Sequence, residues 1–109
     1  MINELITQPN LNLSKEQIIT YCQRWHITQL ALFGSVLRDD FSPHSDIDIL
    51  VTFHPDAQWG LFDLVRMEDE LATLTNRKID LLTKASIEQS RNPLRRQEIL
   101  QTAQVIYES

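Results

Sequence analysis

The chain has 109 residues, with 10 Lys and Arg against 15 Asp and Glu, which gives a formal net charge of -5. Hydrophobic residues make up 42% of the chain and charged residues 23%, a balance typical of one globular domain and unlike that of disordered chains. The single cysteine, Cys22, excludes an intrachain disulfide and a thiolate zinc site.

We expect a cytoplasmic protein, because the sequence contains neither a secretion signal nor an apolar run of the ~20 residues that a membrane span needs. The acidic balance argues against direct DNA binding, which depends on Lys and Arg at the phosphates. A phosphorylated small molecule that arrives with metal ions remains compatible with this charge.

The N-terminal part of the chain predicts an arm followed by an amphipathic helix. Residues 1–13 are polar, so we expect a loosely held arm ahead of a single domain over 14–109. Ser14 and Gln17 have the spacing of a capping box, and apolar residues follow at helical intervals. These features predict a helix over about 14–25.

Two strands are predicted next. Residues 29–33 are an apolar run that stops at Gly34 and Ser35, which is typical of a buried strand entering a tight turn. Residues 46–53 alternate as a strand does. One predicted face carries Ile47, Ile49, Val51 and Phe53, and the other carries Asp46, Asp48, Leu50 and Thr52.

The C-terminal half predicts a helix, a strand and a final helix. Apolar spacing indicates a helix over 61–74, which Asn76 ends in a left-handed conformation, and residues 78–82 form a third strand. Asn92 and Pro93 have the character of an N-cap and a first-turn proline. The inner stripe of this last helix is predicted to contain Ile99, Ala103 and Ile106. Helices alternating with short strands predict an α/β (α+β) domain with one small sheet.

Three aspartates interrupt strands that would otherwise be apolar. Asp46 and Asp48 are two residues apart, so on one strand both side chains would project from the same face. A neighbouring strand would add Asp80. Because an unpaired buried charge is costly, we interpret the three as ligands of a hard cation, with a surface or ion-paired role as the alternative for Asp80. Carboxylates around a pair of Mg²⁺ ions are typical of phosphoryl and nucleotidyl transfer.

Gly34 and Ser35 predict a phosphate site beside these carboxylates. A glycine after a strand lets the backbone approach a ligand, and Ser35 with the amides of the next turn supplies donors. Ser35 would also serve as a helix cap, which uses the same donors. Arg38, one turn later, would add a charged fork for the phosphates or lie in solvent.

The start of the last helix is basic. We interpret its basic residues as a solvated face, with contact to an acidic protein partner as the alternative: Arg91, Arg95 and Arg96.

Gly34-Ser35, ten intervening residues and then Asp46-Ile47-Asp48 form the G-S-x10-D-x-D signature. In this signature the chain resembles the DNA polymerase beta-like nucleotidyltransferase superfamily, and over about 30–82 it is similar to the superfamily's smallest branch, the minimal nucleotidyltransferases. The resemblance implies a small mixed sheet backed by helices. It also implies that Asp46, Asp48 and Asp80 are the catalytic and metal-binding residues, with Gly34, Ser35 and Arg38 at the nucleotide.

The minimal branch further resembles the antitoxin of paired operons whose other product is a HEPN ribonuclease toxin. The resemblance implies Mg²⁺-dependent transfer of AMP from ATP to a tyrosine hydroxyl of the toxin. Two alternatives stay open: an antitoxin that neutralises the toxin by binding alone, and a nucleotidyltransferase that acts on a small molecule. A chain of this length leaves no room for a second substrate-binding domain, which favours an acceptor on another protein.

Overall fold

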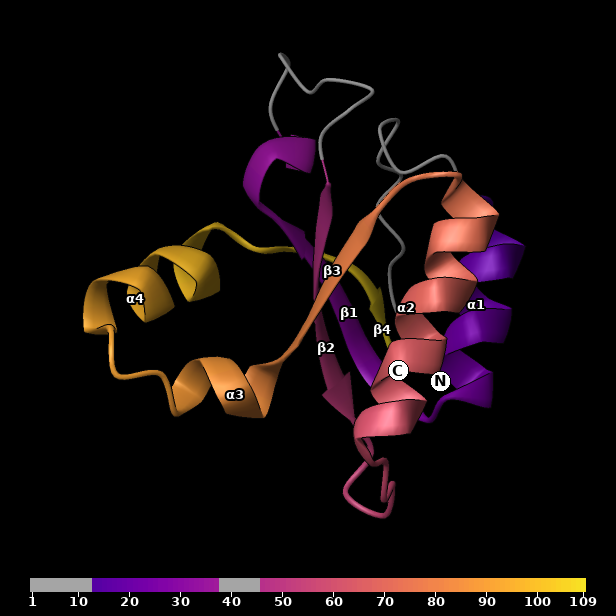
Figure 1. Cartoon of the computed structure of the whole chain (residues 1–109), viewed down its shortest axis with the longest axis horizontal. Coiled ribbons are helices and arrows are strands. Elements are labelled where there is room, and N and C mark those ends of the chain that lie inside the picture. The colour runs from indigo at the N-terminus through magenta and orange to yellow at the C-terminus, as the bar shows by residue number, and fades with distance from the viewer. Residues whose placement is uncertain (1–12, 38–45) are drawn as a thin grey trace.

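The computed structural model describes residues 13–37 and 46–109, so nearly all of the predicted arm over 1–13 lies outside the described residues. In chain order the elements are α1 (Lys15–Arg24), β1 (Ile27–Phe33), the 3-10 helix η1 (Gly34–Leu37), β2 (Ile47–Phe53), α2 (Leu61–Thr75), β3 (Ile79–Thr83), α3 (Lys84–Glu88), α4 (Pro93–Thr102) and β4 (Gln104–Glu108) (Figure 1). None of the helices in this described part is both long and apolar enough to cross a membrane.

The strands form one mixed sheet in the order β3-β2-β1-β4. Strand β1 is antiparallel to both of its neighbours, β2 and β4, whereas β2 and β3 run parallel. The parallel pair is connected through α2, as such a pair requires a crossover. The predicted small mixed sheet backed by helices is confirmed.

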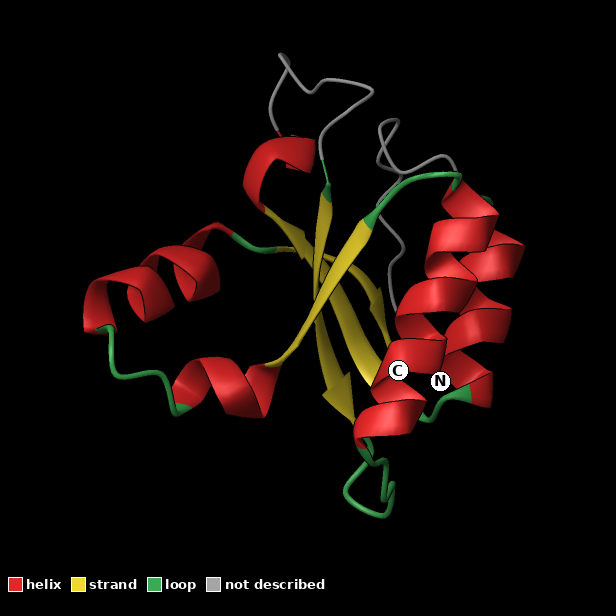
Figure 2. Ribbon diagram, viewed as in Figure 1, coloured by secondary structure: helices red, strands yellow, loops and turns green. Residues whose placement is uncertain are grey.

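The two faces of the sheet are covered by different helices (Figure 2). On β2, Ile49 belongs to a core with residues of α1 and α2, such as Cys22 and Met67. Leu50, the next residue, belongs to a second core together with Ile87 of α3 and Ile99 of α4. The predicted alternation along 46–53 is thus confirmed, and Asp48 shares the face of Leu50 because the side-chain period of a strand is two residues.

Local capping signals correctly predicted where three helices begin or end. The Ser14 side chain accepts from the Gln17 backbone N–H at 3.1 Å, and the Gln17 side chain accepts from the Ser14 backbone N–H at 2.9 Å. Asn76 has φ 55° and ψ 37°, so it is left-handed at the end of α2 as predicted. Asn92 caps α4, with Pro93 in its first turn.

The predicted extension of the last helix through Ile106 is wrong. Helix α4 ends at Thr102, Ala103 has an extended backbone, and residues 104–108 form β4 against β1. Val105, Ile106 and Tyr107 are β-branched or aromatic and therefore favour a strand. Pairing with β1 also satisfies backbone groups that would otherwise line an open sheet edge. The short helix α3 was not predicted either.

Candidate active site

The strand register brings Asp48 and Asp80 side by side. Each is the second residue of its strand, and they are direct partners in the parallel pairing of β2 and β3. Asp48 is half-buried and Asp80 is exposed to solvent. The prediction that Asp80 lies on a neighbouring strand, within reach of Asp48, is therefore confirmed.

Gly34 approaches the same carboxylate from the other side. Phe33, at the end of β1, pairs with Asp48, so the chain leaves β1 directly beside this residue. Gly34 has φ +77°, and a Cβ atom built on it would overlap the Asp48 carboxylate. Both the left-handed backbone and the close approach require glycine here, as the sequence predicted for a tight turn.

The carboxylates repel one another. The pKa of Asp48 is raised by burial first, then by the charges of Asp80 and Asp46 and by a hydrogen bond with Asp80, while Arg95 lowers it. A divalent cation relieves this kind of repulsion, and carboxylate oxygens are the ligands that Mg²⁺ prefers. Asp48 and Asp80 thus fit such an ion in both chemistry and position.

Asp46 has a basic neighbour, Lys78. It precedes β2 instead of lying in it, and its carboxylate is 3.9 Å from Nζ of Lys78. The backbone holds this pair together, since the N–H of Ile47 donates to the carbonyl of Lys78 at 2.9 Å. Over 13–37 and 46–109, no group of three or more His, Cys, Asp or Glu side chains is arranged to hold a metal ion. Asp46 nevertheless contributes to the raised pKa of Asp48, after burial and Asp80.

The remaining predicted site residues are only partly described. Ser35 is the second residue of η1, directly after Gly34, and so lies at the same end of the sheet. Arg38 falls outside the described residues, so its predicted phosphate contact stays a prediction.

Arg95 is exposed, as the sequence predicted for a residue on a solvated face. The sequence did not reveal that its charge lowers the pKa of the Asp48 carboxylate, because the two residues are on different elements. Its position four residues before Ile99 could have indicated this, because residues four apart lie on the same side of a helix. What the sequence could not reveal was the sheet face that this side of α4 covers.

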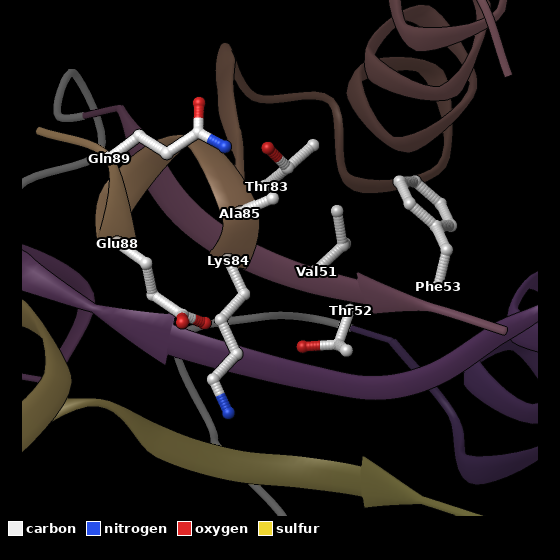
Figure 3. Close-up of a pocket in the computed structure, with 8 residues that line it drawn as sticks. All are labelled: Val51, Thr52, Phe53, Thr83, Lys84, Ala85, Glu88 and Gln89. Carbon is white, nitrogen blue, oxygen red and sulfur yellow. The ribbon is translucent and has the colours of Figure 1, made fainter. Parts of the chain in front are cut away.

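The cavity in Figure 3 is separate from the carboxylates. It has a volume of about 410 Å³ and is lined by Val51, Thr52, Phe53, Thr83, Lys84, Ala85, Glu88 and Gln89. Val51 and Thr83 are register partners at the C-terminal ends of the parallel strands, whereas Asp48 and Asp80 are near their N-terminal ends. We therefore do not assign this cavity to the site.

Comparisons with known proteins agree on one family. The chain is 36% identical over 94 residues to a Methanocaldococcus jannaschii protein provisionally named protein adenylyltransferase MJ0435, a match that covers 86% of this chain and 95% of that protein. It is also 31% identical over 65 residues to protein adenylyltransferase MntA of Thermococcus cleftensis, covering 60% of this chain and 64% of MntA.

Solved structures share the fold. A protein provisionally identified as a minimal nucleotidyltransferase has a TM-score of 0.62 at 27% identity, covering 81% of this chain and 84% of that one. A chain of a toxin-antitoxin complex with AMP-PNP has a TM-score of 0.68 at 19% identity, covering 89% of this chain and 75% of that one. The family model described as a nucleotidyltransferase domain matches residues 15–106. This chain, with Gly34, Asp48 and Asp80 gathered at one end of its sheet, belongs to the nucleotidyltransferase domain family.

Proposed function

We propose that this nucleotidyltransferase transfers AMP from ATP to a tyrosine hydroxyl of a HEPN ribonuclease toxin and thereby acts as its antitoxin. The observation that carries the chemistry is the pairing of Asp48 with Asp80 beside Gly34. The partner is inferred from relatives: protein adenylyltransferase MntA, and a complex described as tri-AMPylated Shewanella oneidensis HEPN toxin with MNT antitoxin, whose antitoxin fold this chain shares at a TM-score of 0.60.

In the proposed reaction, the toxin's hydroxyl oxygen forms a bond to the α-phosphorus of ATP. The bond from that phosphorus to the oxygen bridging to the β-phosphate breaks, and pyrophosphate leaves. The hydroxyl proton passes to the exposed Asp80 carboxylate and from there to solvent. Gly34 and Ser35 seat the β- and γ-phosphates, which the missing side chain at position 34 allows to come close to the backbone.

Asp48 and Asp80, with Asp46 once it leaves Lys78, would hold a pair of Mg²⁺ ions. When bound, Mg²⁺ neutralises phosphate charge and lowers the pKa of the attacking hydroxyl. Arg38 would contact the phosphates as well. ATP as the donor fits the cytoplasmic location that the lone cysteine predicts.

Label transfer from α-labelled ATP tests this function. The wild-type chain with its toxin and Mg²⁺ should label the toxin, and Asp48→Asn or Asp46→Ala should reduce the rate at least about 100-fold, since even residues behind metal ligands cost 10- to 100-fold. Glu88→Gln, an exposed carboxylate in the separate cavity, is the matched control and should keep the wild-type rate.

The intact mass of the toxin after coexpression separates this function from its alternatives. A gain of one or more AMP units on a tyrosine supports it. Toxin that is inhibited but unmodified would contradict it in favour of neutralisation by binding. Label that accumulates only on a small hydroxyl compound would favour a small-molecule acceptor.

A further inference from the structure

Helix α4 lies over the sheet face that carries the reactive carboxylates. Ile99 is the buried residue of this helix, and it packs in the core that contains Phe33 and Leu50. Leu50 is two residues after Asp48 on β2, so the two side chains leave the strand on the same face. The side of α4 that carries Ile99 therefore faces the site.

Arg95 is one helical turn before Ile99, so the two residues share one side of α4, and the Arg95 side chain is exposed. Its position is fixed by the start of the helix, because the Arg95 backbone N–H donates to Oδ1 of Asn92 at 3.2 Å. Its positive charge lowers the pKa of the Asp48 carboxylate, against the larger effects of burial and of the neighbouring aspartates. Among the residues that the structure describes, it has neither a hydrogen-bond nor an ion-pair partner.

A small cavity shows that α4 also reaches the phosphate side of the site. It has a volume of about 280 Å³ and is lined by Phe33, Gly34, Leu37, Glu98, Ile99 and Thr102. Gly34 from η1 and Thr102 from α4 thus share one space. A nucleotide placed at Gly34 and Asp48 would therefore lie beside α4, next to Ile99 and Thr102.

We propose that Arg95 is a further phosphate-binding residue of the site: its guanidinium donates to the phosphate oxygens of a bound nucleoside triphosphate, on the side where Asp48 lies. This inference rests on the proposed nucleotidyltransferase reaction. The carboxylates and the triphosphate are both negative, and a guanidinium fork matches phosphate oxygens in charge and geometry. On the Asp48 side it also offsets the charge that develops as the bond from the α-phosphorus to the leaving oxygen breaks.

Two other arginines allow Arg95 to be tested against matched controls. Arg91 precedes the helix and is exposed, so Arg91→Ala removes the same charge without changing the inner side of α4. Arg96 joins α4 to α3, since its Nη1 donates to the carbonyl of Glu88 at 3.3 Å. Arg96→Ala therefore reports what a loosened α4 does to the site.

The experiment measures the affinity of the full chain for AMP-PNP in Mg²⁺ buffer by titration calorimetry, together with AMP transfer to the toxin. Arg95→Ala should weaken AMP-PNP binding about tenfold, as expected for the loss of one charged hydrogen bond, and should slow transfer further. Arg95→Lys should recover part of the affinity. Arg91→Ala should stay within about twofold of wild type, and circular dichroism should show all variants folded.

Wild-type affinity in Arg95→Ala would overturn the inference, and so would equal weakening in Arg91→Ala or Arg96→Ala. A wild-type chain that binds AMP-PNP but transfers nothing to the toxin would overturn the proposed function, while the binding data would still decide the role of Arg95. A wild-type chain that does not bind AMP-PNP would overturn both.

Discussion

At position 34, backbone conformation and space both exclude a side chain. Gly34→Ala would place a Cβ on a left-handed residue and against the Asp48 carboxylate. We expect a stability loss of about 1–2 kcal/mol from the backbone and a fall in AMP transfer of at least about tenfold, because Asp48 must move. Urea unfolding and the label-transfer rate measure the two effects.

The chain's other glycine provides the control for this substitution. A Cβ on Gly60 would meet nothing closer than Oδ2 of Asp63 at 3.8 Å, and its φ of -95° suits any residue. Gly60→Ala should therefore keep wild-type transfer and lose no more than about 1 kcal/mol of stability as an N-cap change. Equal losses of activity in the two variants would contradict the role of Gly34.

The raised pKa of Asp48 predicts that this residue destabilises the metal-free protein at neutral pH. Its carboxylate has a higher pKa in the folded chain than the ordinary value of about 3.9. Folding thus favours the protonated form, and stability is lost as pH rises from about 4 through the raised pKa. Asp48→Asn should be more stable than wild type at pH 7, by up to about 1 kcal/mol after solvent screening, with the gain vanishing near pH 4.

Thermal unfolding in EDTA at pH 7 and pH 4 checks this expectation. Asp69→Asn, on the exposed side of α2, makes the same chemical change away from the site and should alter stability by less than about 0.5 kcal/mol. A less stable Asp48→Asn protein at pH 7 would show that the carboxylate makes a favourable contact instead.

At the scale of elements, the sequence correctly predicted the helix ends, which depend on residues close together in the chain. Ser14, Asn76 and Asn92 act through caps whose partners lie within a few positions, so their roles were correctly predicted. Strand β4 was predicted as helix because its partner β1 is more than 70 residues earlier, and no local pattern reports that pairing.

Strand β4 should matter to stability far more than an exposed helix end would. Ile106 is fully buried against the core shared with α1 and α2, so Ile106→Ala should cost about 2–5 kcal/mol. Leu100→Ala on α4 is the control, because that side chain is 39% exposed, and it should cost less than about 1 kcal/mol. Similar losses in chemical denaturation would argue against β4 as a core strand.

At the scale of the whole molecule, the site combines residues that the sequence could and could not assign. The motif identified Asp46, Asp48, Gly34 and Ser35 by spacing, and Asp80 by its place in the next strand. Spacing did not reveal that Asp46 pairs with Lys78. Nor could it reveal that α4 faces the carboxylates, because that depends on how Ile99 packs on the sheet.

Cys22 offers a probe of how the whole molecule opens. Its side chain is fully buried between α1 and the sheet, and burial raises the pKa of the thiol above its ordinary value. We expect alkylation by iodoacetamide to be slow in the native protein and to follow unfolding, because both access and thiolate formation require it. Rapid labelling of the native chain, with a rate that does not change in Ile106→Ala, would contradict a closed core.

The position of β1 between β2 and β4 also bears on how the protein is made. Until residues 104–108 have left the ribosome, one edge of β1 stays open, and its N–H and C=O groups are available to other chains. Helix α4 is connected directly to β4, so Arg95 and Ile99 are also anchored late in synthesis. The nucleotide site proposed here is therefore completed after every other part of the sheet, and the nascent chain stays exposed to mispairing until that last strand docks.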